Sequence, residues 1–290
     1  MKKKSRYKEI NTIIFNKLGS LFEEKGWVID DEHNDSSLFS RFCELLSRLN
    51  VEQQEFIIDL TRRYQKVNFD DYTKLINELL NQMTEKLDYF KELKTLYVMP
   101  LVPEKDRNKI KSSTLVAYLF QSPQLKYNPN ISGLDFKVRN ELTPREVNRI
   151  NESPKTRLLL VDDFIGTGET ALNAFNFYKK MGIKSERIII ASLVSLFSGY
   201  NLIRENDIEI FSSKINKRAL SDYYNAKELA EKLNIMQSIE EIVGPHDDYK
   251  FGYKGSEALI TLARTPNNTF PVYWLEKAKG SRVPFPRGGN

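Results

Sequence analysis

Several residue types are scarce in this sequence, and each shortage excludes a class of structure or site. The one cysteine, Cys43, has no partner for an internal disulfide and no nearby base that a nucleophile would need, so we interpret it as a core residue. No apolar run approaches the roughly 18 to 20 residues of a membrane-spanning helix. The first residues lead into an amphipathic pattern instead of a signal-peptide core. These absences predict a cytoplasmic protein that does not enter a membrane.

Histidine is almost as rare as cysteine, which limits metal chemistry. His33 lies in a polar linker and is interpreted as solvated. His246, which is followed by two aspartates, could help to hold a metal ion, although a polar turn after Gly244-Pro245 is the favoured interpretation. We therefore predict no metal-ligating residue.

The composition otherwise predicts a folded protein with a net positive charge. A hydrophobic share of 40% with 29% charged residues is ordinary for a globular chain. The charge of +5 arises mainly at the two ends, whose basic residues are Lys2, Lys3, Lys4, Arg6 and Lys8, and Lys277, Lys279, Arg282 and Arg287. Such tails could contact nucleic acid, but solvated termini are the interpretation that we favour.

Residues 7 to about 93 carry apolar side chains at three- and four-residue steps, which is the spacing of amphipathic helices. No glycine or proline lies between Gly26 and Pro100, so the joints between these helices should be short. We predict two domains, a helical N-terminal region at 1–68 and an α/β domain at 69–290. The added helices offer a surface for a protein partner.

From Leu96 onward the pattern changes to short apolar runs that alternate with helices. The predicted strands are 96–102, 157–161, 188–194 and 208–211, and the predicted helices begin at 112, span 170–180 and surround 226–233. Strands that are apolar throughout belong in a parallel sheet whose two faces are both covered. The predicted fold class is therefore α/β, a mainly parallel sheet flanked by helices and preceded by an all-helical region.

The loop after the strand at 157–161 carries the strongest signal of a site. Ligands of open parallel sheets bind beyond the carboxyl ends of the strands, where this loop lies. Asp162 and Asp163 can accept hydrogen bonds from vicinal hydroxyls such as those of a ribose. Glycines let consecutive N–H groups turn toward one anion, and threonines add hydroxyl donors at a helix start. The residues predicted to surround the anion are Gly166, Thr167, Gly168, Glu169 and Thr170.

This run resembles the signature of the type I phosphoribosyltransferases, which is a hydrophobic strand, two acids, two variable residues and a Gly-Thr-Gly turn. The resemblance covers residues 158–170. It implies that Asp162 and Asp163 hold the ribose hydroxyls of phosphoribosyl pyrophosphate or of a ribose 5-phosphate nucleotide, while the turn wraps the 5-phosphate. It also implies Mg²⁺ that is carried mostly by the ligand.

Glu169 departs from that signature, since a small or hydroxylated residue is common there. Its carboxylate would repel a phosphate unless it turned outward. A response-regulator receiver shares the strand and the acids, but its strand normally opens the domain and no such turn follows. A P-loop is excluded because no Gly-Lys-Ser or Gly-Lys-Thr follows Gly166 at the right spacing. A tight turn without a ligand is the remaining alternative.

In the resembled family, the loop after the first core strand binds pyrophosphate at a helix start. Here residues 103–113 hold four cations against two acids, and the helix start offers unpaired N–H groups. The resemblance points to Lys111, Ser112 and Ser113 as ligand-binding residues. A solvated charged loop is the alternative, because the segment is longer than usual and lacks a glycine-rich apex.

Two further segments stand in places that are known in that family. Residues 127–153 correspond to a mobile loop over the active site, or they form an ordinary surface connection. Residues 251–274 resemble the closing strand and base-facing hood, in which Asn268 and Trp274 could contact a base, although Trp274 is favoured as core. The run 266–274 further resembles a branch found as effectors in bacterial conflict and phage-defence systems.

The resemblance implies an enzyme that acts at ribose C1, a phosphoribosyltransferase of the glycosyltransferase class, or one with related N-glycosidic chemistry. One alternative keeps the ligand without the chemistry, as a sensing or regulatory module that binds a partner. Another is an effector that cleaves or modifies nucleotides when a partner releases it. The sequence leaves these alternatives open.

Overall fold

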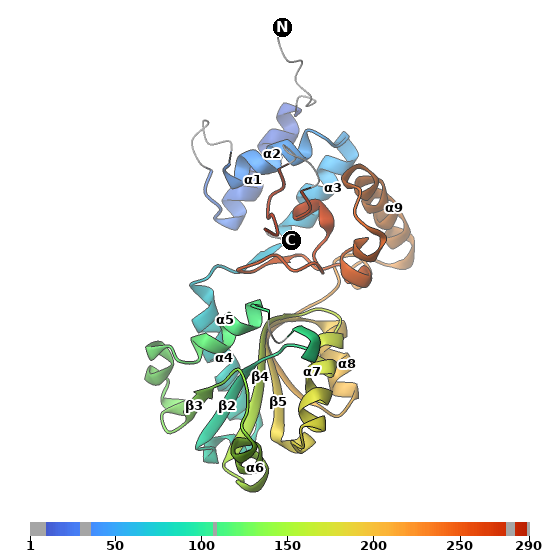
Figure 1. Cartoon of the computed structure of the whole chain (residues 1–290). Helices are drawn as coiled ribbons and strands as arrows, with labels where there is room; N and C mark the ends of the chain where they lie inside the picture. The colour runs from blue at the N-terminus through green and yellow to red at the C-terminus, as the bar shows by residue number, and fades with distance from the viewer. Residues whose placement is uncertain (1–9, 30–35, 107–108, 277–281, 289–290) are drawn as a thin grey trace. The chain divides into compact units, whose positions relative to one another are not determined.

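The computed structural model describes residues 10–29, 36–106, 109–276 and 282–288. The chain divides into two compact units, shown in Figure 1: unit 1 joins residues 1–66 with 218–290, and unit 2 holds residues 67–217. The predicted division at 68/69 lies close to the start of unit 2, whereas residues 218–290 cluster with the N-terminal helices and not with the sheet. His33 and the basic residues at 2–8, 277 and 279 lie outside the described residues.

The helices of unit 1 begin at side chains that satisfy their unpaired N–H groups. They are α1 (Thr12–Lys25), α2 (Leu38–Leu46), α3 (Val51–Arg62) and α9 (Ala226–Val243). Asn11 accepts from the N–H of Ile13, and Asn50 forms a capping box with Gln53. Helix α1 ends at Gly26, whose φ of 62° is left-handed.

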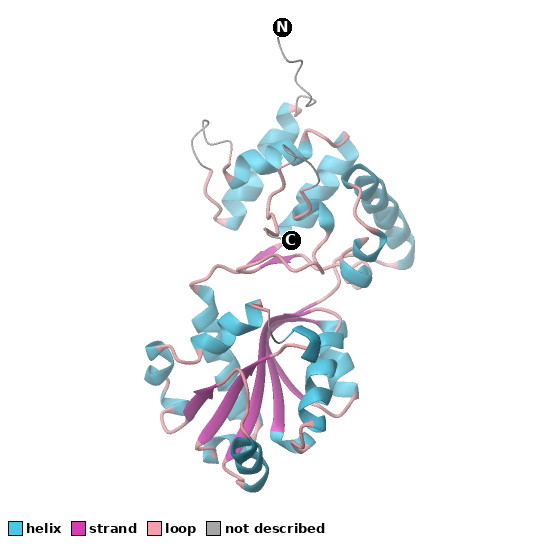
Figure 2. Cartoon of the chain, viewed as in Figure 1, coloured by secondary structure: helices cyan, strands magenta, loops and turns pink. Residues whose placement is uncertain are grey.

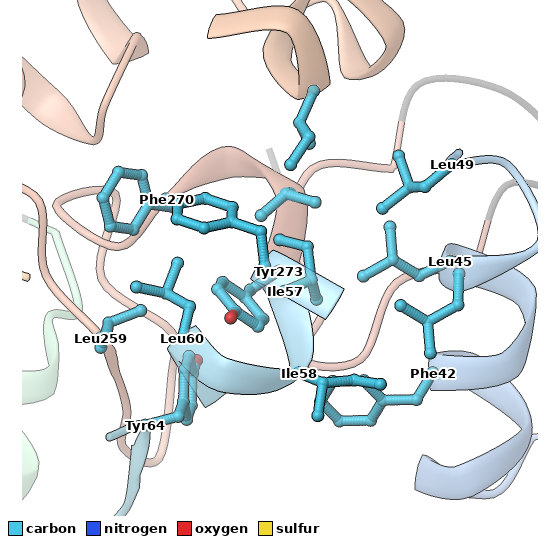
Figure 3. Packing of buried hydrophobic residues seen from close by; sticks show 14 of the residues in the cluster. Phe42, Leu45, Leu49, Ile57, Ile58, Leu60, Tyr64, Leu259, Phe270 and Tyr273 are labelled. Atoms are coloured by element: carbon cyan, nitrogen blue, oxygen red, sulfur yellow. The ribbon is translucent and has the colours of Figure 1, made fainter. Parts of the chain in front are cut away.

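The core of unit 1 explains why the C-terminal segment belongs with the first helices. Figure 3 shows Phe270 and Tyr273 lying among side chains of α2 and α3, including Leu45 and Ile57. The hydroxyls of Tyr273 and Thr61 lie 2.8 Å apart, so this core contains a satisfied polar pair. Cys43 packs against the same cluster, and burial raises the pKa of its thiol to about 11, in agreement with a core role.

The predicted C-terminal strand forms in unit 1, away from the large sheet. It is β7 (Ile260–Thr261), which pairs in parallel with β1 (Gln65–Lys66). Trp274 is buried and its Nε1–H donates to the carbonyl of Thr269 at 2.7 Å, so the prediction of a core tryptophan agrees with its position. Asn268 is also buried, with its side-chain amide donating to Ser256.

Described residues of the C-terminal tail also pack on unit 1. The backbone N–H of Arg282 donates to Glu44 at 2.9 Å, and the guanidinium of Arg287 donates to the carbonyl of Thr265 at 3.1 Å. That guanidinium also lies 5.9 Å from the ring centroid of Trp274. These two arginines are therefore engaged within the protein.

Unit 2 is built on a five-stranded sheet in which every neighbouring pair is parallel, drawn in magenta in Figure 2. The order is β3-β2-β4-β5-β6. The strands are β2 (Thr95–Pro100), β3 (Asp135–Val138), β4 (Thr156–Ile165), β5 (Ile188–Leu196) and β6 (Glu209–Asn216). All residues of β2 and β5 are buried, as expected of strands covered on both faces.

Helices cover both faces of this sheet. They are α4 (Asp71–Lys86), α5 (Ser112–Leu119), α6 (Pro144–Glu152), α7 (Glu169–Lys180) and α8 (Phe197–Glu205). Alternate residues such as Met99 and Leu160 share one core cluster with α6, α7 and α8, while α4 and α5 pack on the other face. The predicted fold class is confirmed. None of the described helices has the length and apolar character to span a membrane.

The segment at 127–153 forms more regular structure than its composition indicates. It contributes the edge strand β3 and the helix α6, which begins with a capping box between Thr143 and Glu146. The segment is therefore not a plain surface connection. Single turns of 3₁₀-helix join the elements, at Asp88–Glu92, Glu104–Asp106, Pro123–Tyr127, Pro129–Ile131, Ser185–Arg187, Asp247–Tyr249, Tyr253–Gly255 and Pro271–Tyr273.

A buried acid in α9 should make unit 1 less stable as the pH rises. Glu240 is 3% exposed, and its Oε1 accepts from the N–H of Phe251 at 2.8 Å. Burial raises the pKa of this carboxyl from 4.5 to about 7. The folded protein therefore keeps a proton that the unfolded chain loses near pH 4.5. The contribution of Glu240 to the free energy of unfolding is fully present below that pH and is lost as the pH rises through about 7.

Glu240→Gln should remove this loss and leave the variant more stable than the wild type by about 2 kcal/mol at pH 8, with little difference at pH 4.5. Urea unfolding followed by tryptophan fluorescence isolates unit 1, because both tryptophans, Trp27 and Trp274, lie there. Glu241→Gln, at the exposed neighbouring residue, is the control. Parallel pH curves for the wild type and Glu240→Gln would contradict the prediction.

Candidate active site

The strand order reverses its direction between β2 and β4. From β2 the chain crosses to β3 at one edge of the sheet, and the next strand, β4, lies on the other side of β2. In open parallel sheets, a crevice forms where the order reverses in this way, at the carboxyl ends of the two strands. The loop that follows β2 and the acid pair of β4 meet at this end.

The acid pair lies within β4, not in a loop after it. Val161 pairs with Ala191 and Asp162 with Ser192, so the sheet continues through the acids to Ile165. Asp163 is 4% exposed, whereas Asp162 is half-buried. An interaction between the two side chains contributes to the pKa of each acid.

Hydrogen bonds hold both acids. Oδ1 of Asp163 accepts from the hydroxyl of Ser112 at 2.6 Å, and Oδ2 accepts from the hydroxyl of Tyr72 at 3.4 Å. Oδ1 of Asp162 accepts from the backbone N–H of Asp163 at 2.9 Å. Three elements therefore meet at this pair: β4, the first turn of α5 and the first turn of α4.

The surroundings of the two acids shift the pKa of each. Burial, followed by the charge of Asp163, raises the pKa of Asp162 well above its ordinary value. Burial also raises the pKa of Asp163, while the hydroxyls of Ser112 and Tyr72 act in the opposite direction. The protein thus holds two acids whose pKa values are both raised, mainly by burial, which is typical of a functional site.

The predicted anion turn leads directly from β4 into α7. Gly168 has a φ of 85° and stands at the N-cap of α7 without a side-chain cap, at the end of the helix whose dipole favours an anion. Glu169 and Thr170 are exposed in that turn, and Thr167 is half-buried. An acid in the first turn also interacts favourably with the helix dipole, which suits an exposed Glu169.

A second glycine, on α8, fixes the position of this turn. A Cβ on Gly199 would lie 2.1 Å from the carbonyl oxygen of Gly166 and 2.9 Å from the nitrogen of Gly168. Gly166 does not have a positive φ, so its role differs from the predicted left-handed conformation: its carbonyl approaches the backbone of α8 closely. Sequence reasoning missed Gly199, because α8 itself was not predicted.

The loop between β2 and α5 reaches the acid pair through Ser112. Lys111 occupies the N-cap position of α5 and its Nζ lies 3.3 Å from Asp106, which also pairs with Lys109 at 2.7 Å. Asp106 therefore neutralises part of the positive charge predicted for this loop. The hydroxyl of Ser113 is buried without a hydrogen-bond partner among the described residues. The structure brings Ser112 and Asp163 together and places Lys111 beside them in sequence.

Two hollows lie beside this site. One of about 310 Å³ lies at the carboxyl end of β2, between Lys109 and Thr114 on one side and Asn140 and Glu141 on the other. A larger, open one of about 840 Å³ runs along the outer side of α7, past Asn176 and Lys180. Both adjoin the loop between β2 and α5, because Pro103 and Glu104 line the larger one and Lys109 and Ile110 line the smaller one.

Two features next to the acids escaped the sequence analysis. Tyr72 was placed only by its helical spacing, with no sign that its hydroxyl meets Asp163. Ser192 faces Asp162 across the ladder, and its hydroxyl lies 2.6 Å from that of Ser195 and 3.1 Å from that of Ser212. A sheet register would have been needed to find either. No cluster of three or more potential metal-ligating side chains occurs within the described ranges.

The sequence profile of the family PRTase-CE matches residues 29–286. The chain belongs to the PRTase-CE family. The match extends over both units, so α2, α3, α9 and the C-terminal segment fall within it together with the sheet, whereas α1 precedes it. The predicted resemblance to phosphoribosyltransferase-like proteins is confirmed at the level of the family.

Solved structures show more distant likenesses to this PRTase-CE protein. Orotate phosphoribosyltransferase from Aeropyrum pernix is 15% identical, with 57% of this chain and 77% of that one covered and a TM-score of 0.31. APRTase from Giardia lamblia complexed with 9-deazaadenine is 15% identical, with 51% of this chain and 78% of that one covered and a TM-score of 0.31. A hypothetical protein from Neisseria gonorrhoeae with bound ppGpp is 11% identical, with 60% of this chain and 97% of that one covered and a TM-score of 0.32. At these scores, the fold assignment rests on the sheet topology and the family match.

Gly199→Ala should displace the anion turn and destabilise unit 2 by about 1 to 3 kcal/mol, because the new methyl group would overlap the backbone of Gly166. Hydrogen exchange measured by mass spectrometry should show faster exchange in peptides that cover 164–172. The control is Gly133→Ala, where the nearest atom to a new Cβ is the Lys94 Nζ at 3.7 Å. Unchanged exchange at 164–172 would show that the close contact does not hold the turn.

Asp162→Asn should stabilise unit 2 at neutral pH, by about 0.5 to 2 kcal/mol, because it removes one of two neighbouring carboxylates from a buried strand end. Slower hydrogen exchange in peptides from β4 and β5 would report this gain. Asp135→Asn, at the exposed amino end of β3, is the matched control and should have little effect. A destabilised Asp162→Asn protein would mean that this carboxylate serves the fold itself.

Proposed function

We propose that unit 2 binds phosphoribosyl pyrophosphate or a ribose 5-phosphate nucleotide and acts at ribose C1. The observation that carries this proposal is the meeting of Asp162 and Asp163 with the Gly166–Thr170 turn and with Ser112, at the carboxyl ends of β4 and β2. Acceptors for two hydroxyls stand beside donors for a phosphate, and both lie at the point where the strand order reverses. Membership of the PRTase-CE family supports the same ligand class.

Each part of the ligand has a matching part of the site. The 5-phosphate would lie on the N–H groups of Gly168 and the first turn of α7, with the hydroxyls of Thr167 and Thr170 near it. The acid pair would accept hydrogen bonds from the ribose hydroxyls. The pyrophosphate end would extend toward Lys111, Ser112 and Ser113, where α5 begins.

The reaction that fits this arrangement is phosphoribosyl transfer. The bond between C1 and the pyrophosphate oxygen breaks and its electron pair leaves with pyrophosphate, while a ring nitrogen of a base forms a bond to C1 and gives up its proton to solvent. Positioning and electrostatics would carry the catalysis, with the carboxylates favouring positive charge at C1. Mg²⁺ carried by the ligand would supply positive charge that neutralises the leaving group.

A second function, ligand sensing without transfer, is favoured by one observation. Asp106 pairs with both Lys109 and Lys111, so these cations are engaged before any pyrophosphate arrives. A module of this kind would pass the signal to a partner, and the exposed Ile13 and Phe15 on α1 offer an apolar surface for it. An effector in phage defence is the biological role consistent with either chemistry, and toxicity on expression alone would be its sign. We place the protein in the cytoplasm, where such ligands occur.

Calorimetric titration of phosphoribosyl pyrophosphate with Mg²⁺ tests the ligand. The wild type should bind it, and Asp162→Asn should weaken binding on the order of 100-fold through loss of a charged acceptor. Asp135→Asn removes the same charge elsewhere in the sheet and should bind like the wild type. No binding by the wild type would refute the proposed ligand.

A pyrophosphate-release assay across the nucleobases then separates the two functions. Release with one base, lost in Asp162→Asn, establishes the transferase and identifies its acceptor. Binding without release by any base supports the sensing function and argues against transfer.

A further inference from the structure

The two acids of the pair have different surroundings in the structure. Both carboxylate oxygens of Asp163 accept from hydroxyls of the protein, one from Ser112 and one from Tyr72. Asp163 is 4% exposed. Asp162 is half-buried, and its Oδ1 accepts from the backbone N–H of Asp163. Asp163 is thus the acid enclosed by protein, and Asp162 is the one nearer to solvent.

The donors to Asp163 are fixed in place by their own packing. Tyr72 is fully buried in the first turn of α4, and its ring stacks on Phe69 with centroids 5.9 Å apart. Ser112 is the first residue of α5, a helix that packs on β2 and β4. A buried carboxylate is destabilising unless hydrogen-bond donors satisfy it. The hydroxyls of Ser112 and Tyr72 therefore stabilise Asp163, and Asp163 in turn holds these hydroxyls in place.

We propose that the two acids have separate roles in the ligand site postulated above: Asp162 contacts the ribose hydroxyls, whereas Asp163 is a positioning residue that locks α4 and α5 to the end of β4. Ser112 and Tyr72 are its partners in this lock. The role of Asp162 in this inference rests on the proposed function, whereas the role of Asp163 as a positioning residue does not. It differs from a site in which both acids bind hydroxyls equally.

The lock explains how the loop after β2 is aligned with the acids. The same turn of α5 holds Ser112, which bonds Asp163, and Lys111 and Ser113, which are proposed to face the pyrophosphate. Fixing Ser112 therefore fixes the direction of the N–H groups at the start of α5. Loss of the lock should weaken pyrophosphate binding more than binding of ribose 5-phosphate, which lacks that end.

The lock can be tested without any ligand. Hydrogen exchange of peptides covering 110–116 should accelerate in Asp163→Ala and in Ser112→Ala, and Ser112→Thr, which keeps a hydroxyl, should restore protection. Asp162→Ala should leave the exchange of 110–116 unchanged. Equal acceleration in Asp162→Ala, or none in Asp163→Ala, would overturn the lock. This arm stands even if the wild type binds no phosphoribosyl pyrophosphate.

Titration with phosphoribosyl pyrophosphate and Mg²⁺ tests the division of roles. We expect a loss on the order of 100-fold for Asp162→Asn, and roughly 3- to 10-fold for Ser112→Ala and for Tyr72→Phe, which is the worth of one hydrogen bond. Asp163→Asn, which keeps an acceptor for Ser112, should fall in the smaller range, and Ser112→Ala should add nothing further to Asp163→Ala. A loss in Asp163→Asn as large as that in Asp162→Asn would show that both acids bind the ligand and would overturn the proposal.

Ribose 5-phosphate is the matched second ligand for these titrations. Ser112→Ala should change its affinity less than it changes the affinity of phosphoribosyl pyrophosphate, whereas Asp162→Asn should weaken both alike. Equal effects of Ser112→Ala on the two ligands would contradict alignment of the pyrophosphate loop by this contact.

Discussion

Burial of two neighbouring carboxyl groups at the end of β4 is the constraint around which unit 2 is arranged. Burial raises the pKa of both Asp162 and Asp163, and the charge of Asp163 adds to the effect on Asp162. Asp163 accepts hydrogen bonds from hydroxyls on two separate elements, one on α4 and one on α5. The loop after β2 and the helix before it thereby acquire defined positions that the sheet alone would not impose.

The anion turn depends on close packing against a neighbouring helix. Gly199 on α8 lets the backbone of Gly166 and Gly168 approach closely, so the turn rests on a neighbouring helix and not only on its own conformation. Hydrogen bonds therefore orient Asp163, and close packing of backbone orients the turn that we propose binds phosphate. The two parts of the site are supported from opposite faces of one sheet, by α4 and α5 on one face and α8 on the other.

The strongly apolar strands and the acid-glycine run could be predicted from sequence because each is local. β2, β4, β5 and β6 all lie where continuous apolar runs indicate them. β3 was missed because an edge strand of four residues has half-exposed side chains and no apolar run. The return of residues 218–290 to the first helices, like the contact of Tyr72 with Asp163, depends on pairings distant in the chain, about which local periodicity carries no information.

Unit 2 is inserted into unit 1, since the chain leaves unit 1 after Lys66 and re-enters it at Arg218. The core of unit 1 needs Leu220, Met236 and Phe270 as well as the first three helices. During synthesis, the helices α1 to α3 must therefore wait for their C-terminal partners, while the sheet of unit 2 is already complete. The nascent chain acquires its acid pair and anion turn before its helical unit can close, so a ligand present in the cell could stabilise the inserted unit at that earlier stage.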